Sequence, residues 1–292
     1  MSVTSPSTAP LLSIDALTVH VPEKERIGGG LGDLTLVDDL CLSIRPGERV
    51  ALVGESGSGK SITARAILRL DPHLRLGGSI EWEGRELIGA PRHVIRALRG
   101  AEISMIFQDP MTALNPVLTI GEQVAEPLLV RGVSKKDAYQ RAAEMLDGLR
   151  VPKAAERLKA YPGQFSGGMR QRVVMAAALI AEPKLLIADE PTTALDVRVQ
   201  EQVLDLLEEQ SRELNLAVLF ITHDLAIVAG LAQRVAVMFR GRVVEEQPVD
   251  DLFARPQHPY TRGLIGSVPR LDADPAVRLM TVADYLQEGS AA

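Results

Sequence analysis

The sequence is poor in cysteine and in long apolar runs. Cys41 is the only cysteine among 292 residues, which excludes an intrachain disulfide and any site built from several thiolates, and fits a reducing cytosol. The longest continuous apolar run, VVMAAALIA at 173–181, is far shorter than a bilayer requires. The N-terminus MSVTSPSTAP has neither a basic region nor an apolar stretch of the secretory kind. We therefore expect no disulfide, no membrane span and no secretion signal.

Excess positive charge and repetition are also missing. Lysine and arginine total 32 against 38 aspartates and glutamates, a formal net charge of -6, so the whole chain offers nucleic acid no general attraction. The sequence shows no internal repeat, coiled-coil heptad or charge block. Hydrophobic residues make up 46%, which is enough for a packed core in one large or two modest domains. We predict a globular protein that does not bind nucleic acid, with residues 1–10 as a loose tail.

Apolar patterning predicts an α/β protein with a helical insert. Alternation in LLSIDALTV and LVDDLCLSI predicts antiparallel strands in the first fifty residues, joined by a turn that contains GGGLG at 28–32. RVALVG, KLLIAD, AVLFIT and RVAVMF read as buried strands that alternate with helices, which favours a mainly parallel sheet. From about residue 112 to 161 the pattern is mostly helical, with Ser134 as a helix cap. One apolar face of that segment comprises Ala138, Ala142, Met145, Leu146 and Leu149.

The segment GESGSGKS at 54–61 carries the pattern G-x-x-x-x-G-K-[ST] between a predicted strand and a predicted helix. Its glycines let backbone N–H groups approach phosphate oxygens, and the helix N-terminus adds about half a positive charge. Lys60 reaches the β and γ phosphates, and Ser61 can hold Mg²⁺. A glycine turn with a purely structural role would not need that lysine and hydroxyl. We predict a nucleotide site formed by Gly54, Glu55, Ser56, Gly57, Ser58, Gly59, Lys60, Ser61 and Ile62.

Further candidate residues follow other predicted strands. LLIADE at 185–190 delivers Asp189 and Glu190 to the end of a buried strand, where ligands of open α/β sheets bind. We predict that Asp189 holds Mg²⁺ and that Glu190 takes a proton from the attacking water. Gln108, after ISMIF, is predicted to ligate Mg²⁺ and that water, and His223, after AVLFIT, to contact the γ-phosphate. The alternatives are a solvated helix cap for the carboxylates, a surface glutamine, and a hydrogen-bonded structural histidine.

A second anion cradle is predicted in FSGGMRQR at 165–172, which opens an apolar helix. Ser166, the amides of Gly167 and Gly168 and the positive helix end together can hold an anion. A nucleotide on residues 54–61 already has its phosphates enclosed, so this second cradle lacks a ligand of its own. We infer a head-to-tail pair of chains, in which the second cradle of each closes over the nucleotide held by the other.

Together these segments resemble the ATP-binding cassette (ABC) family over roughly residues 11–250. The matching motifs are the Walker A GESGSGKS, the Q-loop Gln108, the signature FSGGMRQ, the Walker B LLIADE, the D-loop ALD at 194–196 and the switch His223. The resemblance implies a P-loop NTPase with a RecA-like core, an antiparallel β subdomain, a helical subdomain at about 112–170 and a short C-terminal extension. It implies ATP and Mg²⁺ as ligands, with the metal held by Ser61, Gln108 and Asp189. Implied contacts to the partner's ATP are Ser166, Gly167, Gly168, Gln171 and Asp196.

Three stretches are similar to the ATPases of oligopeptide, dipeptide and nickel importers. They are QDPMTALNPVLTIGEQVAEPL at 108–128, YPGQFSGGMRQRVVMAAAL at 161–179 and RPQHPYTRGLIGSVPRL at 255–271. This implies an ATPase domain at 11–254, an extension at 255–292, and ATP hydrolysis that energises import. The implied partners are two permease subunits, an identical or related ATPase subunit, and a solute-binding protein reached through the permeases. The implied location is peripheral, on the cytoplasmic face of the inner membrane.

The chain departs from the family at two points. Val21 stands where the first strand normally ends with an aromatic that stacks on adenine, a contact of about 0.5–1.5 kcal/mol, so we expect weaker base selectivity. No cysteine follows Cys41, so we expect no iron–sulfur cofactor of the kind that several relatives carry.

Two other functions share these motifs. Soluble ABC proteins that act on DNA or ribosomes usually show tandem cassettes, long coiled coils or zinc cysteines, and this sequence has none of them. A weakly active partner cassette in a heterodimeric importer is the other alternative. Intact Glu190, His223 and signature glycines argue against it.

Overall fold

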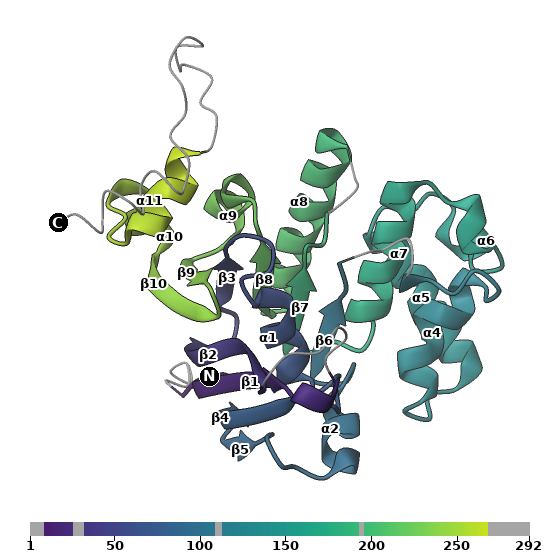
Figure 1. Ribbon diagram of the computed structural model, residues 1–292. Helices are drawn as coiled ribbons and strands as arrows, with labels where there is room; N and C mark the ends of the chain where they lie inside the picture. The colour runs from purple at the N-terminus through teal and green to yellow at the C-terminus, as the bar shows by residue number, and fades with distance from the viewer. Residues whose placement is uncertain (1–8, 26–31, 109–112, 193–195, 268–292) are drawn as a thin grey trace, which may run out of the picture. The chain divides into compact units, whose positions relative to one another are not determined.

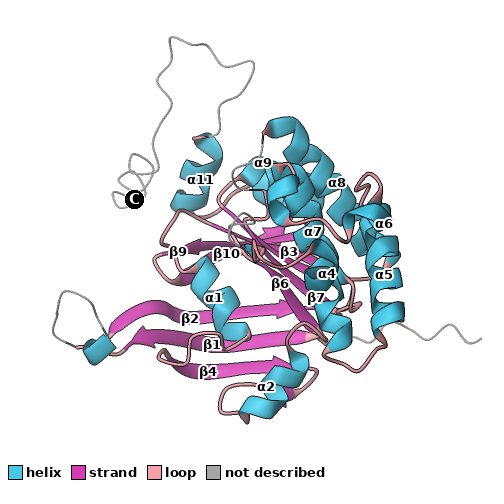
Figure 2. Cartoon of the chain, turned by 90° about the vertical axis from the view of Figure 1, so that its right-hand side faces the viewer, coloured by secondary structure: helices cyan, strands magenta, loops and turns pink. Residues whose placement is uncertain are grey.

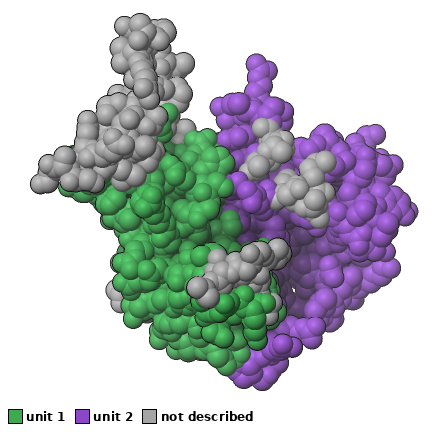
Figure 3. Space-filling view, viewed as in Figure 1, with its two compact units in different colours: residues 1–45, 49–90, 220–292 green, residues 46–48, 91–219 purple. Residues whose placement is uncertain are grey.

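The computed structural model describes residues 9–25, 32–108, 113–192 and 196–267. The chain divides into two compact units, coloured separately in Figure 3. Unit 1 comprises residues 1–45, 49–90 and 220–292, and unit 2 comprises residues 46–48 and 91–219. Most of the glycine-rich turn predicted at 28–32 lies outside the described residues. In the described ranges, no helix is both long enough and apolar enough to cross a bilayer.

The first sheet of unit 1 is antiparallel, with the strand order β2-β1-β4-β5. Figure 2 shows β2, β1 and β4 in this order. Its strands are β1 (Leu12–Val21), β2 (Leu34–Ile44), β4 (Arg75–Trp82) and β5 (Arg85–Glu86). β1 pairs with β2 on one side and with β4 on the other. Leu12, Leu17 and Val19 of β1 are fully buried. The antiparallel strands predicted for the first fifty residues are therefore confirmed.

Unit 1 also contains the strand and helix that flank the residues predicted to bind phosphate. The elements are β3 (Arg49–Val53), α1 (Lys60–Ile67), β9 (Arg234–Phe239) and β10 (Arg242–Pro248). β3 runs parallel to β9, and β10 is antiparallel to β9. Residues 50–53 of β3 are fully buried, as expected for a strand covered on both faces. Strand, glycine loop and helix follow one another directly, as the sequence predicts.

Unit 1 also has helices besides α1. It contains α9 (Leu225–Leu231), α10 (Val249–Ala254) and α11 (Pro259–Gly266), the last two drawn in yellow in Figure 1. The Glu245 carboxylate of β10 accepts the backbone N–H groups of Gln257 and His258 at 2.7 and 2.9 Å. Burial acts to raise the pKa of Glu245, but these and other hydrogen bonds hold it below its ordinary value. The charged carboxylate therefore ties the start of α11 to β10.

Unit 2 combines two parallel strands with a group of helices. The strands are β6 (Ile103–Ile106) and β7 (Leu185–Asp189). The helices are α2 (Arg92–Leu98), α4 (Ile120–Leu129), α5 (Lys135–Gly148), α6 (Ala154–Arg157), α7 (Gly167–Leu179) and α8 (Val197–Glu213), with a 3-10 turn, η2, at Pro162–Gln164. α4 packs against α5 and α7, and α7 packs against α8 (Figure 1). Strand β8 (Ala217–Thr222) is buried along its whole length, and the chain passes along it from unit 2 into unit 1.

The segment predicted to be mostly helical, about residues 112–161, contains α4, α5 and α6. Ser134 caps α5, and its hydroxyl accepts the Asp137 N–H at 3.2 Å. Of the predicted apolar face, Met145 is half-buried. The fully buried members are Ala138, Ala142, Leu146 and Leu149. One side of α5 therefore faces the interior of unit 2.

Candidate nucleotide-binding site

The phosphate loop, residues 54–61, is held by neighbours within unit 1. A Cβ at Gly54 would lie 2.1 Å from the Met238 carbonyl oxygen, so only glycine fits where the loop leaves β3. The Ser58 carbonyl accepts the Gly241 N–H at 2.9 Å. Both contacts come from the β9–β10 hairpin, which therefore supports the loop along its length.

Lys60 is the central charge of this loop. The residue is only 5% exposed, and its Nζ donates to the carbonyl oxygens of Gly54 and Glu55 at 2.7 and 2.8 Å. Ser61 and Ile62 follow it, half-buried, on the first turn of α1. A buried ammonium beside a helix N-terminus favours an anion with several acceptor oxygens. The residues predicted to bind phosphate thus form one continuous loop around the buried Lys60 ammonium.

Tyr260 of α11 also contacts the phosphate loop. Its hydroxyl accepts the Glu55 N–H at 2.8 Å, and the residue is fully buried. Its ring lies 4.2 Å from that of Phe239, centre to centre. Burial raises the pKa of Tyr260, so the hydroxyl stays neutral at physiological pH. No local sequence pattern predicts this contact, because the two residues stand 205 positions apart.

The two carboxylates predicted to hold Mg²⁺ and to act as general base lie in unit 2. Asp189 ends β7 and is 3% exposed. Glu190 follows with a φ of 47°, a left-handed conformation that a residue with a Cβ seldom adopts. Gln108 Nε2 donates to Glu190 Oε2 at 2.9 Å. The structure therefore brings Gln108 and Glu190 together and directs the glutamine's donor end at the carboxylate.

The predicted metal ligands are oxygen donors. Ser61 supplies a hydroxyl, Asp189 a carboxylate, and Gln108 an amide whose nitrogen already binds Glu190. Mg²⁺ prefers such hard oxygen ligands over nitrogen or sulfur. The side chains therefore fit Mg²⁺ by their chemistry.

The second cradle begins α7 in unit 2. Ser166 is the helix N-cap, and its hydroxyl accepts the Met169 N–H at 3.4 Å. Ser166 and Gly167 are exposed. A Cβ at Gly168 would lie 2.4 Å from Val199 Cγ1 of α8. Gly168 therefore lets the start of α8 approach the start of α7 closely.

Asp196 and Gln171 occupy different surroundings near this cradle. Asp196 is exposed and caps α8, where its carboxylate accepts the Val199 N–H at 3.0 Å. Gln171 is fully buried, and its amide donates to the Pro191 carbonyl, which follows Glu190 in the chain. Through Val199 and Pro191, the start of α7 is thus connected to the start of α8 and to the end of β7.

Two predicted elements remain to be located. His223 follows β8 in unit 1 and is exposed. Of the predicted D-loop ALD, only Asp196 lies within the described residues.

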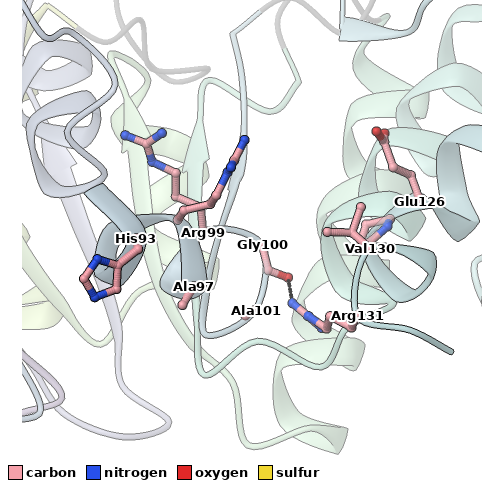
Figure 4. Close-up of a pocket in the computed structure, with 10 residues that line it drawn as sticks. His93, Ala97, Arg99, Gly100, Ala101, Glu126, Val130 and Arg131 are labelled. Carbon is pink, nitrogen blue, oxygen red and sulfur yellow. Dashed lines mark hydrogen bonds between the residues drawn. The ribbon is translucent and has the colours of Figure 1, made fainter. Parts of the chain in front are cut away.

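Unit 2 also carries a surface pocket of about 690 Å³ near the ends of α2 and α4 (Figure 4). Arg131 donates to the Gly100 carbonyl across it. Val130 beside it is 80% exposed. Its lining includes the basic side chains of Arg96, Arg99 and Arg131, the imidazole of His93 and one carboxylate, that of Glu126. The pocket therefore combines positive charge with an exposed apolar side chain.

Two family profiles match the chain. The profile described as ABC transporter matches residues 37–193. The profile described as oligopeptide/dipeptide transporter, C-terminal region, matches residues 244–286. The two matches together cover the phosphate loop, the signature and the helix that carries Tyr260.

Curated proteins match over nearly the whole chain. The oligopeptide transport ATP-binding protein OppD of Escherichia coli is 50% identical over 278 aligned residues, and the match covers 94% of this chain and 82% of that protein. A putative peptide import ATP-binding protein of Brucella abortus is 47% identical over 97% of this chain and 84% of its own length. The similarity therefore extends well beyond the nucleotide motifs.

Solved structures match as well. The dimeric post-hydrolysis state of the ATP-binding cassette MJ0796, bound to ADP and Pi, has a TM-score of 0.71 and 27% identity. The match covers 82% of this chain and 98% of that one. The α/β architecture predicted from the sequence is thereby confirmed.

Proposed function

The chain belongs to the ABC transporter family, and on that premise we propose that it is the ATP-hydrolysing subunit of an importer of peptides. The observation that carries the proposal is that one chain joins an ABC cassette to a C-terminal region of the oligopeptide/dipeptide transporter type. Relatives named for peptide import resemble it over most of its length. The relatives described above are named for oligopeptide transport and peptide import, which favours peptides over nickel as the cargo.

We propose that the phosphate loop holds the triphosphate of ATP and that Lys60 donates to its β and γ oxygens. On binding, Lys60 exchanges the carbonyl oxygens that it contacts now for phosphate oxygens, which are stronger acceptors for an ammonium. Ser61, Gln108 and Asp189 would hold Mg²⁺, which supplies charge neutralisation to the phosphates when bound.

Glu190 is the proposed general base. A water oxygen attacks the γ-phosphorus while the bond from that phosphorus to the β–γ bridging oxygen breaks and ADP leaves, and a proton of the water passes to the Glu190 carboxylate. The hydrogen bond from Gln108 orients that carboxylate before the reaction. His223 is the proposed contact to the γ-phosphate. Binding is thus assigned to the phosphate loop and proton transfer to Glu190.

The second cradle is proposed to act on the ATP of another cassette, identical or related. The exposure of Ser166 and Gly167 supports this, because both remain accessible to a ligand that approaches from outside the chain. The solved cassette that matches this fold is itself dimeric. The proposed contacts to the partner's ATP are Ser166, Gly167, Gly168 and Asp196, together with Gln171, which is fully buried and would have to leave its contact with Pro191 to reach that ATP.

The other proposed partners are two permease subunits and, through them, a solute-binding protein. They would hold the chain on the cytoplasmic face of the inner membrane as a peripheral subunit. The pocket lined by Arg96, Arg131 and their neighbours is the proposed contact with a permease loop, since its positive charge and exposed Val130 suit an acidic and apolar segment.

The function is tested by uptake in the host of this gene. Deletion of the gene is expected to abolish uptake of labelled tri- to pentapeptides, and the parent chain to restore it. The Lys60→Ala and Glu190→Gln chains are expected not to restore peptide uptake. The Ser134→Ala chain, which changes only a helix cap, is expected to restore it. If the deletion strain loses only nickel uptake, or if it loses no uptake at all, the assignment to peptides is overturned.

The permease contact is tested separately with Val130→Asp. This variant is expected to fractionate away from membranes while it binds ATP as the parent does. Leu214→Asp is the control, since Leu214 is an exposed apolar residue at the end of α8, outside the pocket. Equal membrane retention of both variants would exclude the pocket as the contact.

A further inference from the structure

A single peptide group in the phosphate loop forms a hydrogen bond through its carbonyl oxygen and another through its N–H group. Its carbonyl belongs to Gly54 and accepts from Lys60 Nζ at 2.7 Å. Its N–H belongs to Glu55 and donates to the Tyr260 hydroxyl at 2.8 Å. Because a peptide group is planar, fixing the N–H also fixes the direction of the carbonyl. The tyrosine therefore determines the orientation of an acceptor that Lys60 uses.

The Tyr260 hydroxyl is itself firmly placed. The residue is fully buried, and its ring lies against Phe239. Phe239 follows Met238, whose carbonyl oxygen lies against Gly54. His258 Nδ1 accepts the Tyr260 N–H at 3.1 Å, and Glu245 ties the preceding backbone to β10. The start of α11 is thus anchored through the backbone up to the tyrosine and through the tyrosine ring.

The two hydrogen bonds of this peptide group respond differently to nucleotide. Phosphate oxygens compete with the Gly54 carbonyl for Lys60, because a charged acceptor binds an ammonium more strongly than a peptide carbonyl does. The bond from Glu55 to Tyr260 does not depend on Lys60. When the lysine changes its acceptors, the tyrosine is therefore the contact that keeps this part of the loop in place.

We propose that Tyr260 is a positioning residue for the phosphate loop, and that through it the C-terminal extension, residues 255–292, sets the affinity of the loop for nucleotide phosphates. This inference rests on the proposed binding of ATP by that loop. It adds a role for the extension in the nucleotide site itself. A tyrosine that serves only the packing of α11 would affect stability and leave nucleotide affinity unchanged.

The test is Tyr260→Phe in the full chain, which keeps the ring against Phe239 and removes only the hydroxyl. Loss of one hydrogen bond that orders the loop is expected to raise the Kd for a fluorescent ATP analogue about two- to tenfold. The hydrolysis rate at saturating ATP is expected to match that of the parent, so the effect appears in KM and not in kcat. The factor is expected to be equal for ATP and GTP, because the loop contacts phosphates and not the base.

Ser267→Ala is the matched control, because it removes a hydroxyl that caps the same helix and donates to the Leu264 carbonyl. It is expected to leave the Kd unchanged. A Tyr260→Phe chain that melts at a lower temperature but has the Kd of the parent would overturn the proposal and leave a packing role. A parent chain that binds no ATP would instead refute the proposed function.

Amide hydrogen exchange in the parent chain tests the contact without a substitution. The Glu55 amide is expected to exchange far more slowly than an exposed loop amide, since Tyr260 accepts its proton. Exchange of Glu55 at the rate of an unprotected amide would contradict the proposal even if Tyr260→Phe does not fold.

Discussion

The two anion cradles of this chain differ in how completely they are built. The phosphate loop has a buried lysine, a glycine pressed against the β9–β10 hairpin and a tyrosine that holds its backbone. The second cradle is an exposed helix start with one capping hydrogen bond, 3.4 Å long. A cradle fixed by its own unit can bind a ligand by itself, whereas the exposed one needs a ligand delivered from outside. The difference favours a shared nucleotide as the function of the second cradle.

The substitution with the largest expected effect distinguishes ATP binding from ATP hydrolysis. Glu190→Gln keeps the shape of the side chain but removes the base, so turnover should fall about 10²- to 10⁴-fold. ATP binding should persist, because the phosphate loop in unit 1 is unchanged. Turnover is measured by the release of phosphate, and ATP binding by equilibrium titration. Near-normal turnover would remove Glu190 from its role.

The next effect tests the packing that supports the second cradle. Gly168→Ala places a methyl group against Val199 and should lower the free energy of unfolding by about 1–3 kcal/mol. ATP turnover should fall as well, because the added methyl group forces the starts of α7 and α8 apart. Gly148→Ala is the control, since nothing lies within 4 Å of a Cβ at that helical glycine, and its added helix propensity should stabilise by up to about 1 kcal/mol.

Chemical denaturation of both glycine variants measures this difference. Adding Val199→Ala to Gly168→Ala should restore stability, because it removes the side chain that the new methyl group meets. Equal stability of the two single variants would show that α7 and α8 do not approach as closely as described.

A smaller effect distinguishes a cap from a ligand contact. Ser134 and Ser166 both cap helices of unit 2 through their hydroxyls, so replacing either by alanine should destabilise the chain by about 1 kcal/mol. Only Ser166→Ala should also lower ATP turnover. Denaturation and ATPase assays on both variants make the comparison. If both variants hydrolyse ATP equally, Ser166 is a cap and nothing more.

The smallest effect concerns the base of the nucleotide. Val21 ends β1 and is half-buried. Val21→Tyr should strengthen ATP binding by about 0.5–1.5 kcal/mol through stacking and should sharpen the preference for ATP over GTP. Competition binding of the two nucleotides to both chains measures it. A preference equally steep in the parent would show that Val21 costs no base selectivity.

Local patterns predicted the elements well. The Ser134 cap, the buried strand that ends at Asp189 and the loop that leads into α1 all depend on neighbours within a few residues. Periodicity and capping chemistry therefore contain the necessary information. The antiparallel pairing of β1 with β2 was predictable because the two strands are consecutive in the chain and are joined by a turn-rich segment.

Contacts between distant residues were not predictable in this way. The bond from Gln108 to Glu190 spans 82 positions and that from Glu55 to Tyr260 spans 205. The buried position of Gln171 depends on Pro191, and the close approach of Gly168 depends on Val199. Such pairs follow from the packing of elements, which a local pattern does not encode.

The central claim is that one ATP is held by the phosphate loop of one chain and the second cradle of another. The most direct measurement is an experimental structure of Glu190→Gln with Mg²⁺ and ATP, together with its partner cassette. We predict that the Ser166 hydroxyl and the Gly168 amide lie within hydrogen-bond distance of a γ-phosphate bound at Lys60 of the other chain. An ATP enclosed within a single chain, with both groups remote from every phosphorus atom, would contradict the account.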